Sequence, residues 1–302
     1  MIPVIYGRIK NELAKVYVGE SRIIKALCVA LFTGGHVLLE GVPGLAKTTL
    51  ARGLSTLIGG QFRRIQFTSD LMPSDITGSS VYRIDRGEFK FIPGPIFGNV
   101  ILADEINRAP ARTQGALLEA MQENQVTVDG VRYDMPKPYF VIATQNTLDE
   151  RGTYPLPESQ LDRFMFRICL GYPSEREERL IIAQQMMPEP ELEPVLELDN
   201  ILEFQKRSKR ILISDSIVQY ITDLIRYSRK LPGVVRGASP RAGAMLLRAS
   251  RGYALLRNRD YVVPDDVNTA LPLVLNHRIV LEDEDDSVDD FIEALRNTVA
   301  YK

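Results

Sequence analysis

The sequence predicts an α/β fold in which a five-stranded parallel sheet is followed by a smaller, all-α domain. Three observations support this fold class. Five short, nearly continuous apolar runs lie in the first part of the chain, and segments with helical spacing of apolar residues separate them. A glycine-rich turn joins the first run to a helical segment, and after residue 173 only helical spacing remains. Strands that are apolar along their whole length are typical of parallel sheets covered on both faces by helices.

The expected strands share this apolar character, and each is followed by a turn or by polar residues. The helix after the first strand, 48–58, carries Leu50, Leu54 and Leu57 on one face. A second helix is expected at 112–123. The five strands are expected at 37–39, 64–67, 100–103, 139–143 and 164–170.

Two insertions interrupt this alternation. The segment 68–99 is rich in Pro, Gly and Ser and contains three phenylalanines. Thirty residues without regular structure are unusual inside a compact domain, so we expect a short helix or a hairpin there. The segment 125–133 alternates around Asp129 and Gly130, which predicts a second hairpin.

The second domain is expected to contain helices only. The segment 174–187 begins with a plausible cap and an acidic first turn, and 188–194 reads as an extended linker. Further helices are expected at 214–230, 240–257, 264–276 and 288–299.

The composition is typical of a globular protein. Of 302 residues, 45% are apolar, and 37 basic and 39 acidic residues give a formal net charge of -2. This balance gives no reason to expect the whole molecule to be drawn to nucleic acid or an anionic membrane, although it leaves room for a local basic groove. Cys28 and Cys169 lie in apolar runs and are expected to be buried free thiols. Without a membrane-spanning stretch or a signal-peptide pattern, a cytoplasmic location is expected.

The turn after the first strand has the pattern of a phosphate-binding loop. Its glycines let backbone N–H groups point toward phosphate oxygens, and the following helix N-terminus favours negative charge. Lys47 would reach the terminal phosphates, and the Thr48 hydroxyl would hold Mg²⁺. Ala46 stands where glycine is usual, which costs conformational freedom if this residue has a positive φ. The predicted nucleotide-binding residues are Gly41, Val42, Pro43, Gly44, Leu45, Ala46, Lys47, Thr48 and Thr49.

Polar side chains also follow two other expected strands. Asp104 and Glu105 follow the strand at 100–103, and Asn146 comes after the strand at 139–143. Ligands bind at the carboxyl ends of strands in open parallel sheets. Asp104 is suited to orient the Mg²⁺ shell with Thr48, and Glu105 to polarise an attacking water. Asn146 is placed to hydrogen-bond that water or the γ-phosphate, so the sequence predicts a site for ATP with Mg²⁺.

Longer segments of the chain resemble the MoxR family of AAA+ ATPases, in the helix-2-insert group. Ala46 is the residue usual at its position in that family, so the departure from the common loop pattern agrees with the resemblance. The resemblance implies a P-loop AAA+ core at 1–173 and a helical lid at 174–302. The segments that carry it are 40–48, 102–109, 143–146, 156–164, 237–242 and 275–278.

The resemblance also implies roles for single residues. Arg163 matches the arginine finger, which reaches the γ-phosphate bound to a neighbouring subunit. Arg241 matches sensor 2, which closes over the nucleotide from the lid, and Asn146 matches sensor 1. Val18 and Gly19 match a segment that packs on the adenine. An arginine suits the first two roles because its guanidinium keeps its charge and offers a fork of donors to phosphate oxygens.

The implied activity is Mg²⁺-dependent ATP hydrolysis by a ring, expected to be a hexamer, that remodels or matures a partner protein. Partners in this family often carry a von Willebrand factor A domain. The inserts at 68–99 and 125–135 would face the pore or a partner, and Arg108 is a candidate for an intersubunit contact. Three alternatives stay open: a nucleic-acid-dependent NTPase motor, a chelatase-type subunit and a slowly hydrolysing scaffold.

Overall fold

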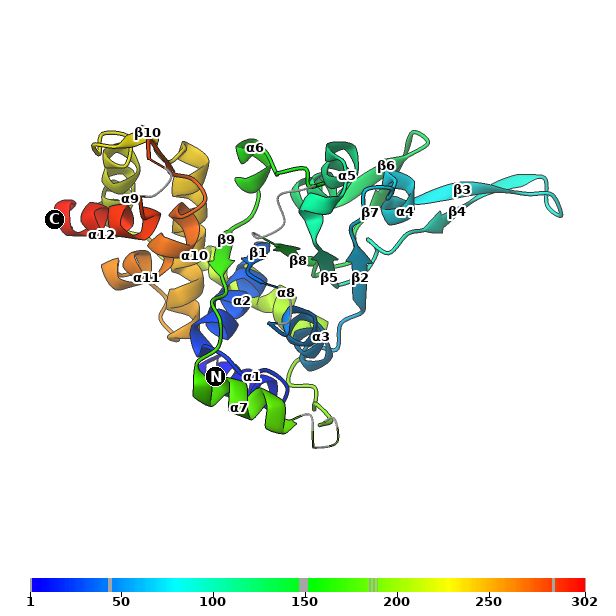
Figure 1. The fold of residues 1–302 in the computed structure, drawn as a ribbon, viewed down its shortest axis with the longest axis horizontal. Helices are drawn as coiled ribbons and strands as arrows, with labels where there is room; N and C mark the ends of the chain where they lie inside the picture. Colours follow the sequence, from blue (N-terminus) through cyan, green and yellow to red (C-terminus); the bar gives the residue numbers. More distant parts are fainter. Residues whose placement is uncertain are drawn as a thin grey trace.

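The computed structural model describes residues 2–42, 45–146, 152–184, 186, 188, 190–283 and 286–301. Its centre is a five-stranded sheet with the order β2-β5-β8-β1-β9, in which every pair of neighbours is parallel (Figure 1). All five expected strands are therefore confirmed. Their bounds are β1 Val37–Glu40, β2 Phe62–Gln66, β5 Val100–Asp104, β8 Phe140–Gln145 and β9 Phe166–Cys169.

Alternate residues of the strands enter two different hydrophobic clusters, one on each face of the sheet. In β5, Val100 and Leu102 pack into the cluster that contains the first three helices, whereas Ile101 and Ala103 pack against α5. This alternation follows from the two-residue period of a strand. The helices concerned are α1 Ile2–Leu13, α2 Ser21–Thr33, α3 Lys47–Leu57 and α5 Ala111–Glu123. The sheet is thus covered on both faces, as its continuous apolar strands require.

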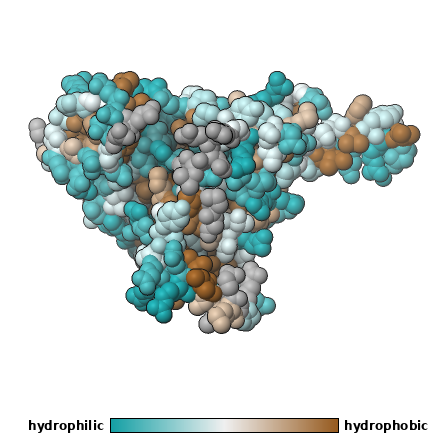
Figure 2. All heavy atoms as spheres, in the orientation of Figure 1, coloured by the Kyte–Doolittle hydropathy of each residue, from teal (hydrophilic) through white to brown (hydrophobic). Residues whose placement is uncertain are grey.

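The first insertion contains both a short helix and a hairpin. Helix α4, Pro73–Thr77, precedes the antiparallel strands β3, Gly78–Arg83, and β4, Glu88–Pro93, which project from the molecule as a narrow arm (Figure 1). Apolar side chains are exposed along this arm, among them Ile84 at 89% and Phe89 at 73% (Figure 2).

The second expected hairpin is also present, as β6, Gln125–Val128, and β7, Val131–Asp134. Phe91 of the arm stacks on Tyr133 of this hairpin, with ring centroids 3.9 Å apart. This contact joins the two insertions at the base of the arm.

The second half of the chain is mainly helical. The expected helices are confirmed as α7 Glu175–Gln184, α9 Asp215–Tyr227, α10 Pro240–Leu256, α11 Pro264–Leu275 and α12 Val288–Thr298. Two features were not expected: helix α8, Leu198–Arg210, and a short antiparallel pair of β10, Val234–Arg236, with β11, Val280–Leu281. The prediction of helices only after residue 173 is corrected by this pair of strands.

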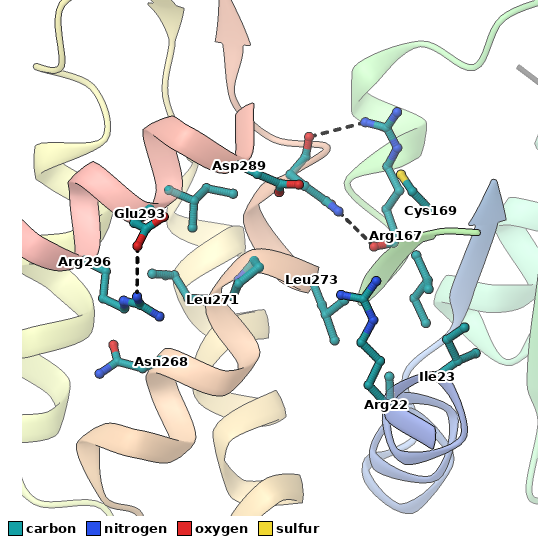
Figure 3. A pocket seen from close by; sticks show the side chains of 15 residues that line it. Arg22, Ile23, Arg167, Cys169, Asn268, Leu271, Leu273, Asp289, Glu293 and Arg296 are labelled. Atoms are coloured by element: carbon teal, nitrogen blue, oxygen red, sulfur yellow. Dashed lines mark hydrogen bonds and ion pairs between the residues drawn. The ribbon is translucent and has the colours of Figure 1, made fainter. Parts of the chain in front are cut away.

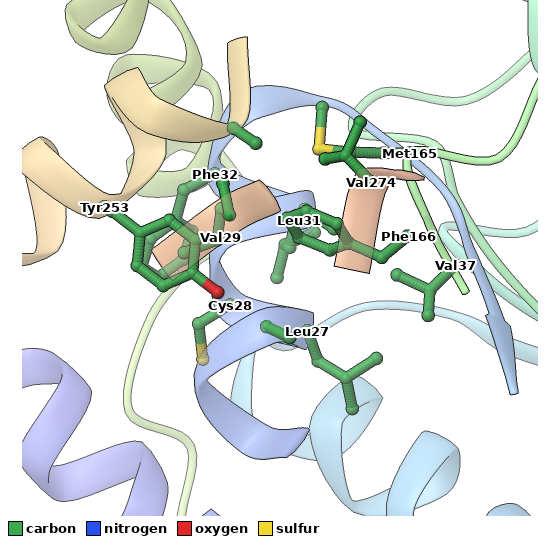
Figure 4. Packing of buried hydrophobic residues seen from close by; sticks show 14 of the residues in the cluster. Leu27, Cys28, Val29, Leu31, Phe32, Val37, Met165, Phe166, Tyr253 and Val274 are labelled. Atoms are coloured by element: carbon green, nitrogen blue, oxygen red, sulfur yellow. The ribbon is translucent and has the colours of Figure 1, made fainter. Parts of the chain in front are cut away.

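The lid helices share a hydrophobic cluster with the α/β core, centred on α2. Figure 4 shows Phe32 of α2 close to Tyr253 of α10, and Leu31 beside Val274 of α11 and Phe166 of β9. Phe204 of α8 also meets the Phe32 ring edge-on at 5.0 Å. Helix α8 therefore packs on the core, and the division of the chain at residue 173 stays a prediction.

The two cysteines differ in their surroundings. Cys28 is buried in α2, and burial raises the pKa of its thiol to about 12. Cys169 is exposed at the end of β9, so the expectation that both thiols are buried is wrong for this residue. Within the described parts of the chain, no helix is long and apolar enough to cross a membrane.

Candidate nucleotide site

The predicted phosphate loop connects β1 to α3, as its pattern requires. Pro43 and Gly44 lie outside the described residues, and Val42 precedes them. Gly41 has a φ of 151°, and a Cβ placed on it would lie 2.6 Å from the Leu170 carbonyl oxygen, so only glycine fits there. Ala46 has a φ of 53° and a ψ of 26°, the left-handed conformation that glycine adopts more readily than alanine. The loop therefore holds Ala46 in a strained backbone conformation directly before Lys47.

Half of the predicted site residues line one cavity of about 400 Å³ at the carboxyl ends of the strands. The structure thus brings the phosphate loop together with residues that lie about 60 and 100 positions later in the chain, as expected for an open parallel sheet. The lining residues are Leu45, Ala46, Lys47, Thr48, Thr49, Arg64, Gln66, Asp104, Glu105, Thr144 and Asn146.

The Lys47 ammonium is half-buried in this cavity. Desolvation lowers the pKa of Lys47, while the carboxylates of Asp104, Glu105 and Glu40 act in the opposite direction. Its Nζ donates a hydrogen bond of 2.6 Å to the Gly41 carbonyl oxygen. A cation held in a partly dehydrated space interacts more strongly with phosphate than one in bulk water does.

Asp104 is held from two sides. Thr144 Oγ1 donates to Asp104 Oδ1 at 2.7 Å, and Arg64 Nη2 contacts Asp104 Oδ2 at 2.6 Å. Thr144 Oγ1 also accepts a hydrogen bond of 2.9 Å from the Glu105 backbone N–H. One threonine of β8 therefore fixes both the Asp104 side chain and the backbone that carries Glu105.

The Glu105 carboxylate points into the same cavity and is oriented by two neighbours. Gln66 Nε2 donates to Glu105 Oε2 at 3.1 Å, and Arg108 Nε lies 2.9 Å from the same oxygen. Glu105 itself has a left-handed backbone, with a φ of 57°. Non-glycine residues in this conformation are uncommon and often lie at functional sites. Arg108 thus contacts Glu105 within its own chain, and its predicted role between subunits stays a prediction.

Sequence reasoning missed three residues of this cavity: Arg64, Gln66 and Thr144. Arg64 and Gln66 are two positions apart in β2, so both side chains lie on the same face at the strand's carboxyl end. A sequence pattern could have identified these two residues, because β2 was expected and its polar residues alternate with apolar ones. The partners of these residues, Asp104 and Glu105, could be known only once the strand order was known.

The donor set fits Mg²⁺ better than a transition metal. Thr48 and Asp104 offer hydroxyl and carboxylate oxygens in the same cavity. Among the described residues, no group of three or more His, Cys, Asp or Glu side chains is arranged to hold a metal ion. Mg²⁺ is typically bound by one or two protein oxygens together with substrate phosphates, so a sparse oxygen set is what it needs.

The segment expected to contact the adenine lies beside the phosphate loop. Val18 and Gly19 line a cleft together with Leu45 and Ala46 of the loop and Tyr172. Because Leu45 and Ala46 also line the phosphate cavity, the cleft and that cavity are adjacent. This arrangement suits a nucleotide whose base and phosphates occupy neighbouring spaces.

Arg163 and Arg241 line a different cavity, of about 180 Å³, together with Arg248. Arg163 Nη1 donates to the Leu118 carbonyl oxygen at 2.8 Å, and the Arg241 side chain is 49% exposed. Neither arginine lines the cavity of Lys47. The lid places Arg241 beside Arg163, and the role of Arg241 in closing over the nucleotide stays a prediction.

Both histidines of the chain are buried and hydrogen-bonded. His36 Nδ1 accepts a hydrogen bond from the Val141 N–H, and its Nε2 lies 3.1 Å from the Met121 carbonyl oxygen. Burial is the main cause that lowers the pKa of His36 to about 4. His277 Nε2 lies 2.6 Å from Arg278 Nη1, and burial and this cation hold the pKa of His277 well below its ordinary value.

We expect stability to fall on acidification because of these histidines. Between pH 6.5 and pH 4 the unfolded chain binds protons at both histidines that the native chain does not bind, so the free energy of unfolding falls as the pH is lowered. For His36, a pKa of about 4 corresponds to a loss of about 3 kcal/mol once the pH is below that value. Urea unfolding at several pH values should show a smaller loss in His36→Gln, whose amide can donate and accept but does not titrate. Equal pH dependence in both proteins would contradict this assignment.

Comparison with known proteins places the chain among ATPases. It matches a model of the ATPase family associated with various cellular activities at residues 36–166 and one of the AAA lid domain at 228–295. It is 46% identical over 280 residues to YeaC of Bacillus subtilis, covering 92% of this chain and 88% of that protein. It is 44% identical over 279 residues to Chaperone MoxR1 of Mycobacterium tuberculosis, covering 89% of this chain and 74% of that protein. A solved structure of a candidate ATPase from Cytophaga hutchinsonii is similar over 100% of this chain and 96% of its own, with a TM-score of 0.92 and 38% identity.

Proposed function

Because the chain belongs to the MoxR family of AAA+ ATPases, we propose that it binds ATP with Mg²⁺ and hydrolyses it to ADP and phosphate. The observation that supports this most strongly is the single cavity shared by Lys47, Thr48, Asp104 and Glu105. These are the groups that phosphoryl transfer to water requires: a cation for the terminal phosphates, oxygens for Mg²⁺ and a base for the nucleophile.

In the proposed reaction, Glu105 orients a water molecule for attack on the γ-phosphorus. The new bond joins the water oxygen to phosphorus, the bond to the β-phosphate oxygen breaks, and the water proton moves to the Glu105 carboxylate. Mg²⁺, when bound beside Thr48 and Asp104, neutralises phosphate charge. Gln66 and Arg108 hold one Glu105 oxygen, which reduces the number of orientations that the carboxylate can adopt.

We further propose that each complete site is formed by two copies of the chain, in a ring that is most simply a hexamer. Within one chain, Lys47 and Arg163 line separate cavities. A head-to-tail contact between copies can bring the arginine cavity of one chain to the phosphate cavity of the next, and contacts of this type close into rings. Arg163 and Arg241 would then stabilise the transferring phosphoryl group together, from the neighbouring chain.

This arrangement predicts that turnover per chain depends on protein concentration. Dilution dissociates the ring and separates Lys47 from the arginines, so phosphate release per chain should fall as the protein is diluted at saturating ATP. Lys47→Ala lacks the phosphate-binding cation, so phosphate release measured with this variant gives the background rate. Turnover per chain that stays constant down to concentrations at which the protein sediments as a monomer would contradict a shared site.

We propose that hydrolysis drives the remodelling or maturation of a partner protein in the cytoplasm. One close relative is named a chaperone, and the arm of β3 and β4 presents exposed apolar side chains suited to a protein partner. A von Willebrand factor A domain in the partner is the specific expectation. The net charge of -2 disfavours a nucleic-acid motor.

Capture of partners from the native host, with Glu105→Gln loaded with ATP as bait, tests this part of the proposal. Enrichment of one protein with a von Willebrand factor A domain would support it. Enrichment of a metal-inserting enzyme would favour the chelatase-type alternative, and ATP turnover stimulated by DNA would favour the motor.

A further inference from the structure

We propose that Asp162 and Arg278 form a positioning pair that holds Arg163 and Arg241 together as one phosphate-binding unit. This inference rests on the proposed shared site. Asp162 immediately precedes Arg163 and lies at the end of the short helix α6, Glu158–Leu161. Arg278 follows α11 in the lid, so the pair joins the core segment that carries one arginine to the domain that carries the other.

The Asp162 carboxylate lies between the two domains. Arg278 Nε donates to Asp162 Oδ1 at 2.6 Å, while Asp162 Oδ2 lies 3.9 Å from Arg241 Nε and 3.5 Å from Ser239 Oγ. Ser239 is the N-cap of α10, the helix whose second residue is Arg241. A single carboxylate therefore contacts the start of the helix that bears Arg241 and is covalently next to Arg163.

The Arg278 guanidinium holds the backbone on both sides of Arg163. Its side chain is only 3% exposed, and Nη2 donates to the Asp162 carbonyl oxygen at 3.0 Å and to the Phe164 carbonyl oxygen at 2.7 Å. His277, kept neutral by burial and by this cation, accepts from Nη1. A planar guanidinium with several fixed donors restricts the backbone of Arg163 more than a flexible ammonium would.

Charge gives a second reason for the pair. Arg163, Arg241 and Arg248 line one cavity, and Arg278 and Arg241 both lie within 4 Å of the Asp162 carboxylate. Cations this close repel one another unless an anion lies among them. Asp162 supplies that negative charge while the phosphate is absent, and its removal should let the Arg241 end of α10 move away from Arg163.

Arg167 of β9 makes a second link between the core and the lid, on the nucleotide side, and offers a contrast. Arg167 Nη2 contacts the buried Glu40 carboxylate at 2.6 Å, just before the phosphate loop. Arg167 also exchanges hydrogen bonds with Asn276 of the lid (Figure 3). Arg167 and Asn276 line a cavity of about 310 Å³ between core and lid. If the Asp162–Arg278 pair and Arg167 only held the two domains together, disturbing either link should have the same consequence.

The decisive experiment mixes Asp162→Asn with Lys47→Ala before ATP is added. Alone, Asp162→Asn should keep its ATP affinity within twofold and lose at least tenfold in turnover. In an equal mixture of the two variants, about a quarter of the sites of a randomly assembled ring combine the intact phosphate loop of an Asp162→Asn chain with the intact arginines of a Lys47→Ala chain. Turnover of the mixture should therefore recover toward about a quarter of the unaltered rate.

Glu40→Gln should not be rescued by mixing with Lys47→Ala, because its defect lies beside its own phosphate loop. Asp260→Asn, which removes an exposed carboxylate paired with Arg207, is the matched control and should turn over normally.

Arg278→Lys is the second variant, in case Asp162→Asn does not fold. It keeps the charge but loses the fork of donors, and a loss of at least fivefold in turnover with unchanged ATP affinity is expected. Normal turnover in either folded variant, or failure of Lys47→Ala to rescue Asp162→Asn, would overturn the positioning pair. Arg163→Ala tests the shared site separately from the positioning pair. If mixing with Lys47→Ala rescues Arg163→Ala while Asp162→Asn alone turns over normally, the shared site holds and only the positioning pair is wrong.

Discussion

Replacing Glu105 by Gln is expected to leave ATP bound and to lower turnover by a factor of about 10²–10⁴, the range typical of a lost general base. The amide keeps the shape of the side chain and can still hydrogen-bond Gln66, but it cannot take the proton of the attacking water. The cavity retains Lys47, Thr48 and Asp104, so affinity for ATP should not fall. Phosphate release under saturating ATP and calorimetric titration of ATP measure the two effects separately.

The control for this variant is Glu119→Gln, on the exposed face of α5. It makes the same chemical change outside the cavity and should hydrolyse ATP at the unaltered rate. If Glu105→Gln also hydrolyses normally, Glu105 is not the base, and the fixed orientation that Gln66 and Arg108 give it has another purpose.

The sheet could be predicted because its signal is local. Each strand is a short apolar run, and the alternation with helices restricts such runs to a parallel arrangement. The same holds for Asp104 and Glu105, which lie at the carboxyl end of β5, and for Lys47, which begins the helix after β1. Strands that run in the same direction place their carboxyl ends at one edge, so these residues had to meet.

The features that could not be predicted depend on contacts between distant segments. Helix α8 was omitted because few apolar residues mark it among charged ones, and its helical state depends on packing against α2. The place of Arg241 depends on how the lid sits on the core. That placement results from the shared cluster around α2 and from ion pairs between distant segments, such as Arg278 with Asp162, which no local pattern reveals.

Replacing Arg163 by Ala is expected to lower turnover at least tenfold while ATP affinity stays nearly unchanged. An arginine supplied from a neighbouring chain contributes about 10³–10⁵ in rate in related phosphoryl transfer, equivalent to about 4–7 kcal/mol of barrier. The expected loss is set at only tenfold or more because Arg241 shares the cavity and would keep part of the positive charge. Phosphate release and ATP titration on the assembled protein measure the change.

Mixing distinguishes a residue that acts across the interface from one that acts within its own chain. Arg163→Ala and Lys47→Ala are each impaired for a different reason, and a mixture of the two re-forms complete sites wherever an intact phosphate loop meets an intact arginine cavity. Arg226→Ala, an exposed arginine of α9, is the control and should neither lose activity alone nor change the mixture. A mixture that stays inactive, with rings of normal size, would show that Arg163 serves its own chain. Because the two cavities are separate in one chain, that result would also require the lid or the segment before β9 to move toward Lys47 on ATP binding.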